Sequence, residues 1–425
     1  MELKWHIHLI AARSAPSGGE QGAVRRKYSL KVFNTLNGRL ETFRSITEGR
    51  VKMFVCGPTV QGPMHVGHAR TDVFYDVLAR YLRQVGYKVT FLMNVTDIDE
   101  SIVEGAREEG VSTETFVANN IRDYVENMRK LKVMTVTRLE RVSGYVVEAI
   151  RQVTKLLESG HAYLADGNVY FDTSTYARFG RLSHQSREEL TLRPTELSLN
   201  KRNLTDFILW RSSSFGQRWS SPWGEGVPGW HIQDTAVSIA NFGPQYDIHG
   251  GAYELIYPHH EAEMAQAESL TGAVPFVRYW IHVGLVTSNG RKMSKSEGNA
   301  VTVGEILHEV SSSSLRFYLL DSRYHDDLEF NYEGLTAADE RFRELKHRAR
   351  SILQRPYQVQ DGVLAEQIME PFLNALEDDL NTARAIWTLT RTIDEAAETC
   401  GSKGSPLYAI AAKAMAGILG LDLFG

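Results

Sequence analysis

The sequence has little cysteine, little net charge and no long apolar run. Its 425 residues include two cysteines, Cys56 and Cys400, which are too few for a disulfide framework and compatible with a reducing compartment. No run of about 18 apolar residues is present, which argues against a membrane span. A net charge of −5 argues against a chain coated with nucleic acid, although it is compatible with a local basic groove. The sequence therefore predicts an ordered, cytoplasmic protein that does not enter a membrane.

The length predicts several structural units, because one domain ordinarily has about 100 to 200 residues. Residues 1–28 lack a long apolar segment of the secretory type and predict a poorly ordered N-terminal extension. Residues 29–97 and 226–300 carry strand and helix patterns that predict two halves of one sheet, separated by an insertion at residues 98–225. Residues 301–425 are helical in pattern nearly throughout, which predicts an all-α domain.

A βαβ unit is predicted near the start of the first half. Residues 50–57, RVKMFVCG, are dense in apolar side chains, as in a buried parallel strand, and residues 88–95, KVTFLMNV, form a second such run. Between them, apolar residues from Val66 to Leu82 recur at spacings of three and four, the stripe of an amphipathic helix. The predicted fold class is therefore α/β, with a Rossmann-like parallel sheet split by an insertion and followed by an all-α helical bundle.

The turn after the first strand contains HVGH at residues 65–68. His65 and His68 stand at the expected start of the helix, where free backbone N–H groups and the positive end of the dipole attract anions. Gly67 lets a ligand approach the backbone closely. These features predict a phosphate site, although capping or core histidines explain an isolated motif of this kind at least as well.

A second motif, RKMSKSEGN at residues 291–299, is a polar, basic loop after an apolar strand. Lys292 and Lys295 are flanked by serines and suit a polyphosphate whose charge grows during a reaction. A solvated basic loop is the alternative for this motif taken alone. Chance seldom supplies both motifs in one chain.

HVGH in the first turn and KMSKS after the last strand of a split sheet resemble the class I aminoacyl-tRNA synthetases. Further stretches look like the cysteinyl-tRNA synthetases over residues 29–420: FVCGPTVQGPMHVGHAR, NVTDIDE, SPWGEGVPGWHI, YDIHGG, YPHHEAE and RKMSKSEGN. The resemblance implies that L-cysteine is activated by ATP with Mg²⁺ and transferred to tRNA(Cys). It also implies that residues 301–425 bind tRNA, and we expect a monomer.

The same resemblance implies roles in the reaction. The implied ATP-binding and catalytic residues are His65, Gly67, His68, Lys292 and Lys295. Lys295 is the implied contact to the phosphates in the transition state, Thr59 the implied contact to the amino acid, and Trp230 the implied aromatic wall over its side chain. No covalent nucleophile is needed, because in-line attack of a carboxylate on the α-phosphate depends on positioning and charge stabilisation.

The resemblance further implies one zinc ion per chain, held by Cys56, Asp234, His259 and Glu263. His259 and Glu263 lie four residues apart, so their side chains share one face of the helix expected to begin near Pro258. Asp234 departs from the family pattern, which commonly has cysteine there. Zinc accepts a carboxylate oxygen at about 2.0 to 2.2 Å, so the set still supplies three negative ligands and one neutral one. It is a harder set, and we expect it to hold zinc less selectively.

Other departures leave alternatives open. Gln61 and residues 252–254 differ from the common family pattern, which puts the amino-acid pocket in doubt more than the ATP site. The sequence ends at GILGLDLFG, where familiar members continue into a small basic segment. The related mycothiol cysteine ligase, which joins cysteine to an amino sugar, is trimmed in the same way, but it lacks the second glutamate of HHExE. Glu263 therefore favours a synthetase. The intact HVGH and KMSKS motifs argue against the other alternative, a degenerate synthetase that serves as an RNA-binding module.

A basic cluster lies in the predicted helical domain. Its members are Lys346, His347, Arg348 and Arg350. Such a cluster would suit the phosphate backbone of tRNA, whereas a charged helix face is more often simply solvated.

Overall fold

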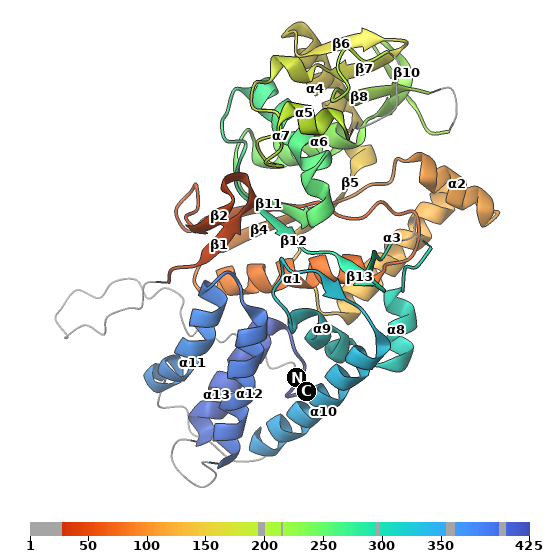
Figure 1. Ribbon diagram of the computed structural model, residues 1–425. Helices are drawn as coiled ribbons and strands as arrows, with labels where there is room; N and C mark the ends of the chain where they lie inside the picture. The colour runs from red at the N-terminus through yellow and green to blue at the C-terminus, as the bar shows by residue number, and fades with distance from the viewer. Residues whose placement is uncertain (1–27, 194–199, 214–215, 295–297, 354–361, 399–404) are drawn as a thin grey trace, which may run out of the picture.

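The computed structural model describes residues 28–193, 200–213, 216–294, 298–353, 362–398 and 405–425. The expected N-terminal extension therefore lies outside the described residues, apart from Tyr28. A five-stranded parallel sheet forms the centre of the molecule (Figure 1), in the order β12-β11-β3-β4-β5. Its strands are β3 (Arg50–Val55), β4 (Lys88–Val95), β5 (Arg138–Arg141), β11 (Tyr246–Ala252) and β12 (Val277–Val283).

The topology of this sheet reverses between β3 and β11. From β3 the chain proceeds to β4 and β5 on one side, and it later returns to place β11 and β12 on the other side. Parallel strands end at the same edge, and a crevice opens where the strand order reverses, so the carboxyl ends of β3 and β11 are the expected ligand site.

The predicted βαβ unit is confirmed. Helix α1 (Val66–Gln84) connects β3 with β4 and buries an apolar face that includes Val73, Leu78 and Tyr81. Helices α2 (Glu100–Glu108) and α3 (Thr113–Lys130) then lead into β5. Because β5 pairs with β4, the central sheet continues beyond residue 98, where the sequence predicted that the insertion would begin. The sequence of β5, RLER, contains a single apolar residue and so gives no strand signal of its own.

The insertion between β5 and β11 has its own antiparallel sheet, in the order β6-β7-β8-β10-β9. Its strands are β6 (Ala162–Ala165), β7 (Asn168–Phe171), β8 (Phe207–Ser212), β9 (Trp219–Ser221) and β10 (Gly224–Pro228), and its helices are α4 (Val146–Glu158) and α5 (Arg187–Thr191). Helices α6 (Trp230–Phe242) and α7 (His259–Thr271) pack between this sheet and the central one. They are the helices that carry the candidate metal ligands.

Two small β structures flank the central sheet. The hairpin of β1 (Lys31–Asn34) and β2 (Arg39–Thr42) lies beside β12. A three-stranded sheet joins β13 (Val286–Ser288), β14 (Arg291–Lys292) and β15 (Leu328–Glu329), so the chain beyond residue 301 contributes one short strand as well as helices. Short 3₁₀ helices span Thr35–Asn37, Val142–Tyr145, Thr173–Thr175 and Tyr253–Ile256.

The C-terminal region is otherwise helical, as predicted. Its helices are α8 (Val303–Glu309), α9 (Ser312–Leu320), α10 (Tyr332–Leu353), α11 (Gly362–Glu377), α12 (Thr382–Glu398) and α13 (Ser405–Leu419). They lie on the opposite side of the central sheet from the insertion (Figure 1), and α1 packs against both α9 and α13. Among the helices that the structure describes, none combines the length and the apolar surface that a bilayer crossing requires.

A buried ion pair fastens the C-terminal helices to the central fold. Arg316 of α9 places Nη2 2.5 Å from Oδ2 of Asp76 on α1, and it also donates to the carbonyl oxygens of Leu131 and Leu419. One apolar core runs without a break from the sheet into this region. The boundary predicted at residue 300 is therefore a change in secondary structure and not a gap in packing.

Candidate active site

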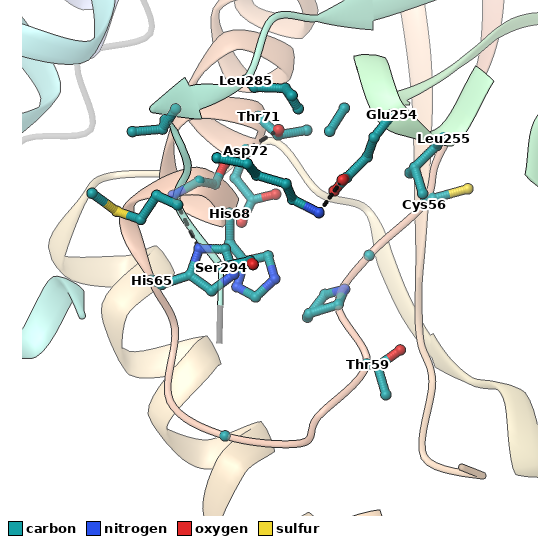
Figure 2. Close-up of a pocket in the computed structure, with 18 of the residues that line it drawn as sticks. Cys56, Thr59, His65, His68, Thr71, Asp72, Glu254, Leu255, Leu285 and Ser294 are labelled. Atoms are coloured by element: carbon teal, nitrogen blue, oxygen red, sulfur yellow. Dashed lines mark hydrogen bonds and ion pairs between the residues drawn. The ribbon is translucent and has the colours of Figure 1, made fainter. Parts of the chain in front are cut away.

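An open cavity of about 290 Å³ lies where β3 and β11 end, at the reversal point of the sheet. Its walls come from the turn after β3, the start of α1 and the loop around β14. Figure 2 shows Cys56 and Thr59 on the first of these segments and His65 and His68 facing the same space. Segments more than 200 residues apart therefore line one cavity.

His65 and His68 form a stacked pair at the start of α1. His65 is the N-cap residue, and its Nδ1 accepts a hydrogen bond from the Gly67 N–H at 3.1 Å. The two rings stack with centroids 3.7 Å apart. A Cβ atom at residue 67 would lie 2.9 Å from the His65 ring, so glycine is what permits this turn.

Both histidines are neutral at pH 7. Burial, followed by the nearby Lys292, lowers the pKa of His65 to about 4, and burial holds the pKa of His68 well below its usual range. The pair therefore offers hydrogen bonds and a helix N-terminus to a phosphate, but no positive charge. A cation must come from another segment.

The basic loop supplies that cation. Lys292 forms an ion pair with Glu254, drawn as a dashed line in Figure 2. Asn299 shapes the loop, since its Nδ2 donates to the Lys292 carbonyl at 2.9 Å and its Oδ1 accepts from the Ser294 N–H at 3.0 Å. Lys295 lies outside the described residues, so its contact to ATP stays a prediction. The sequence identified Glu254 only as a departure from a pattern and missed this pairing.

The four predicted metal ligands converge behind the cavity. Cys56 follows β3, Asp234 belongs to α6, and His259 and Glu263 project from α7. The Sγ of Cys56 lies 3.0 Å from Asp234 Oδ2, and His259 Nε2 lies 3.2 Å from the same oxygen and 3.1 Å from Glu263 Oε1. One ligand atom from each residue falls within 4.8 Å of all the others. We call these four residues the outer set.

Neighbouring side chains orient the outer set. Asn94 Nδ2 donates to Asp234 Oδ1 at 2.8 Å, and the Nδ1 atoms of His231 and His259 lie 2.8 Å apart. With Oδ1 bonded to Asn94, Asp234 directs Oδ2 at the cluster. With Nδ1 next to His231, His259 directs Nε2 at the cluster. Such supporting contacts are typical of metal ligands.

The electrostatics of the cluster fit a cation. Burial, and then the charges of Asp234 and Glu263, raise the pKa of the Cys56 thiol well above its usual value. Burial and Asp234 likewise raise the pKa of Glu263. Glu263 Oε2 is buried and accepts no hydrogen bond from the described residues. The cluster thus holds three acidic groups close together and one carboxylate oxygen without a hydrogen-bond donor among the described residues. A bound zinc-class cation would offset the repulsion among these groups and coordinate that oxygen. The sulfur, nitrogen and oxygen donors are those that zinc accepts.

Two histidines that the sequence did not assign complete the cluster. His249 of β11 and His260 of α7 place their Nε2 atoms 3.3 and 3.2 Å from Cys56 Sγ. Burial holds the pKa of each imidazole well below its usual range, so both are neutral. The motifs YDIHGG and YPHHEAE contain them, but helical spacing paired only His259 with Glu263.

Glu261, the other glutamate in the first turns of α7, has a structural role. Glu261 accepts hydrogen bonds from the N–H groups of Gly180 and Ser183 at 2.9 and 2.8 Å. It thereby joins α7 to the insertion, and it takes no part in the ligand set.

The two predicted substrate contacts lie in different cavities. Thr59 lines the cavity of Figure 2. Trp230 begins α6, is 60 % exposed, and donates its ring N–H to Asp99 Oδ2 at 2.6 Å. It lines a neighbouring cavity of about 470 Å³ together with His231, and it is absent from the described lining of the first one.

Comparison with known proteins identifies similar chains. The family of class I (C) tRNA synthetase catalytic domains matches residues 42–340. The cysteine--tRNA ligase of Thermoplasma acidophilum is 43% identical over 304 residues, which cover 71% of this chain and 67% of the relative. That of Legionella pneumophila (strain Paris) is 39% identical over 394 residues, which cover 92% and 85%.

Solved structures support the same fold. Mycobacterium tuberculosis methionyl-tRNA synthetase, in complex with methionyl-adenylate, has a TM-score of 0.62 at 15% identity and covers 87% of this chain and 89% of its own. A leucyl-tRNA synthetase of Agrobacterium radiobacter K84 has a TM-score of 0.62 at 12% identity. The match covers 89% of this chain and 84% of that chain. The predicted α/β fold with a split parallel sheet and a helical C-terminal region is thus confirmed.

Proposed function

Since the chain belongs to the cysteine--tRNA ligase family of class I tRNA synthetases, we propose that it activates L-cysteine with ATP and transfers it to tRNA(Cys), releasing AMP and pyrophosphate. One observation carries this proposal. Four side chains that can ligate zinc converge at the same cavity as a helix N-terminus that can bind phosphate. A thiol-binding centre and a nucleotide site must adjoin in an enzyme that adenylates cysteine.

The nucleotide occupies the cavity between α1 and the basic loop. His65, Gly67 and His68 provide hydrogen bonds and the helix N-terminus, while Lys292 and Lys295 neutralise the phosphates, with Mg²⁺ carried in by ATP. Glu254 holds Lys292 until the phosphates replace it as the partner. We assign Thr59 to contact with the amino acid and Trp230 to the aromatic wall over its side chain; the two residues line different cavities.

One zinc ion per chain is held by Cys56, Asp234, His259 and Glu263. When bound, zinc supplies a Lewis-acidic centre for the substrate thiolate. Asn94 and His231 keep Asp234 and His259 in place through the hydrogen bonds described above. With aspartate at position 234, the set has one sulfur donor, so we expect easy removal by chelators and tighter zinc in the Asp234→Cys variant.

The tRNA reaches the site across the helical C-terminal region. The basic cluster predicted there is mostly paired within the protein: Lys346 lies 3.5 Å from Asp422 and Arg348 lies 2.5 Å from Asp394, while Arg350 donates to the Gly425 carbonyl. These pairs leave less positive charge for RNA than the sequence indicated. We place the reaction in the cytoplasm and assign it to a monomer.

The test is aminoacylation of total tRNA with labelled cysteine and serine offered in parallel, on protein whose zinc content is measured first. Charging of tRNA(Cys) with cysteine alone is the expected result. Product formation only with an added amino sugar would favour the small-molecule ligase, and RNA binding without ATP/pyrophosphate exchange would favour a degenerate module. The relatives' names favour neither alternative.

A further inference from the structure

The cluster around Cys56 contains a second complete set of four ligands. Cys56, His249, His260 and Glu263 also have one ligand atom each within 4.8 Å of all the others. We call them the inner set. It shares Cys56 and Glu263 with the outer set and replaces Asp234 and His259 with two imidazoles.

The two imidazoles of the inner set are oriented as metal ligands are. His249 Nδ1 lies 2.5 Å from the Tyr246 hydroxyl, which leaves Nε2 directed at Cys56 Sγ, 3.3 Å away. His260 Nδ1 lies 2.8 Å from His282 Nε2, and its own Nε2 lies 3.2 Å from the same sulfur. A ligating histidine ordinarily has its far nitrogen fixed by a hydrogen bond in this way.

Glu263 faces both sets, one with each carboxylate oxygen. Its Oε1 lies 3.1 Å from His259 Nε2, and its Oε2 lies 3.6 Å from His249 Nε2. That second oxygen is buried and accepts no hydrogen bond from the described residues. A buried carboxylate oxygen without a partner is costly, and a cation between Glu263 and His249 would satisfy it.

Donor type favours the inner set when no substrate is present. The buried charge of the whole cluster is the same in either position, because Asp234 stays buried 3.0 Å from Cys56 Sγ wherever the ion lies. Zinc accepts imidazole and thiolate readily, and the inner set exchanges an oxygen donor for a nitrogen donor.

Exposure separates the two sets. The side chain of His259 is 16% exposed, so the outer set reaches solvent on one side. His249, His260 and Glu263 are fully buried. Each set supplies four protein ligands, so a substrate can join only as a fifth ligand. The partly exposed side of the outer set, at His259, allows that approach, whereas the buried imidazoles of the inner set do not.

We propose that His249 and His260, with Cys56 and Glu263, form a second and closed metal position that holds the zinc-class ion while no cysteine is bound. The ion has two positions that share a thiolate and a carboxylate. The inner position stores the ion, and the outer one presents it to the substrate. This goes beyond the proposed function, which requires only the outer set.

X-ray absorption at the zinc edge of the full chain tests the proposal, because it counts the imidazoles bound to the ion. The inner set supplies two and the outer set supplies one. We expect two imidazoles per zinc in the parent protein without cysteine and one in the His249→Gln/His260→Gln variant. A parent spectrum with one imidazole, identical to that of this variant, overturns the proposal.

A second variant tests the inner set by itself. Asp234→Asn/His259→Gln removes two outer ligands and is expected to retain about one zinc per chain, since four inner ligands remain. The Cys56→Ser variant, which weakens both sets, is the matched control for metal loss, and circular dichroism checks that each variant is folded. Zinc content in folded Asp234→Asn/His259→Gln that is no higher than in Cys56→Ser overturns the proposal.

The results separate this proposal from the proposed function. A parent protein with no zinc that still activates cysteine selectively contradicts the outer zinc site and the inner one together. Zinc bound with a single imidazole and normal charging contradicts only the inner position.

Discussion

Replacement of Cys56 by serine removes the one sulfur donor of the site. Its Sγ lies 3.0 Å from Asp234 Oδ2 and 3.9 Å from Glu263 Oε1, and both carboxylates are buried around it. Serine is nearly isosteric, so the change leaves the packing of β3 and α7 intact while it replaces a thiolate by a neutral hydroxyl. The expected effects are weaker zinc binding and weaker discrimination against serine as a substrate.

The size of both effects follows from the ligand count. Four-ligand zinc sites bind with about 10 to 16 kcal/mol, so one ligand contributes roughly 2.5 to 4 kcal/mol, or about 10² to 10³ in affinity at 1.4 kcal/mol per tenfold. A pocket that separates cysteine from serine by shape alone reaches only about 10 to 200-fold, whereas a strong specific bond to the thiol reaches about 10⁴. Discrimination should therefore fall by about two orders of magnitude.

Two measurements on one protein preparation check this prediction. Zinc affinity is obtained by competition with a chelator, and discrimination by ATP/pyrophosphate exchange with cysteine and serine in parallel. The other cysteine of the chain provides a matched control, since Cys400→Ser changes the same chemistry far along the sequence from the ligands and should alter neither quantity. Zinc affinity within tenfold of the parent, together with unchanged selectivity, would refute the reasoning.

Three further predictions concern other parts of the molecule. Lys295→Ala should slow ATP/pyrophosphate exchange by about 10² or more with little change in ATP binding, because the lysine acts on transition-state charge; a rate within a few-fold of the parent would contradict this role. Arg316→Met should lower the free energy of unfolding by about 3 to 5 kcal/mol in denaturant titrations, since buried Asp76 loses one of its two arginine partners and the carbonyl oxygens of Leu131 and Leu419 lose the Arg316 donor; a loss below 1 kcal/mol would contradict it. Burial raises the pKa of Asp72 to about 7 from a usual value of 3.8, so its contribution to stability falls as pH rises between these values. Asp72→Asn should therefore raise the melting temperature more at about pH 8 than at about pH 5. An equal rise at both pH values would contradict a raised pKa of Asp72.

The sequence predicted a helix or strand correctly wherever that element has its own pattern of apolar residues. The run KVTFLMNV gave the bounds of β4, and the apolar stripe from Val66 gave α1, because periodic burial is written into adjacent residues. The spacing of His259 and Glu263 on one helix face was likewise a local property. Strand β5 carried no such pattern, and its place in the central sheet came from pairing with β4.

By itself, the sequence determined the α/β class and the nucleotide motifs, since each depends on residue type and spacing within a short segment, whereas the four residues of the outer set were implied by the family resemblance. Only the tertiary structure placed His249 and His260 against Cys56, from positions 193 and 204 residues away. It also joined Lys292 to Glu254 and fastened Arg316 to Asp76 across the predicted boundary at residue 300. Such contacts arise where parallel strands end at one edge and helices share one core, and neither condition leaves a periodic signal in the chain.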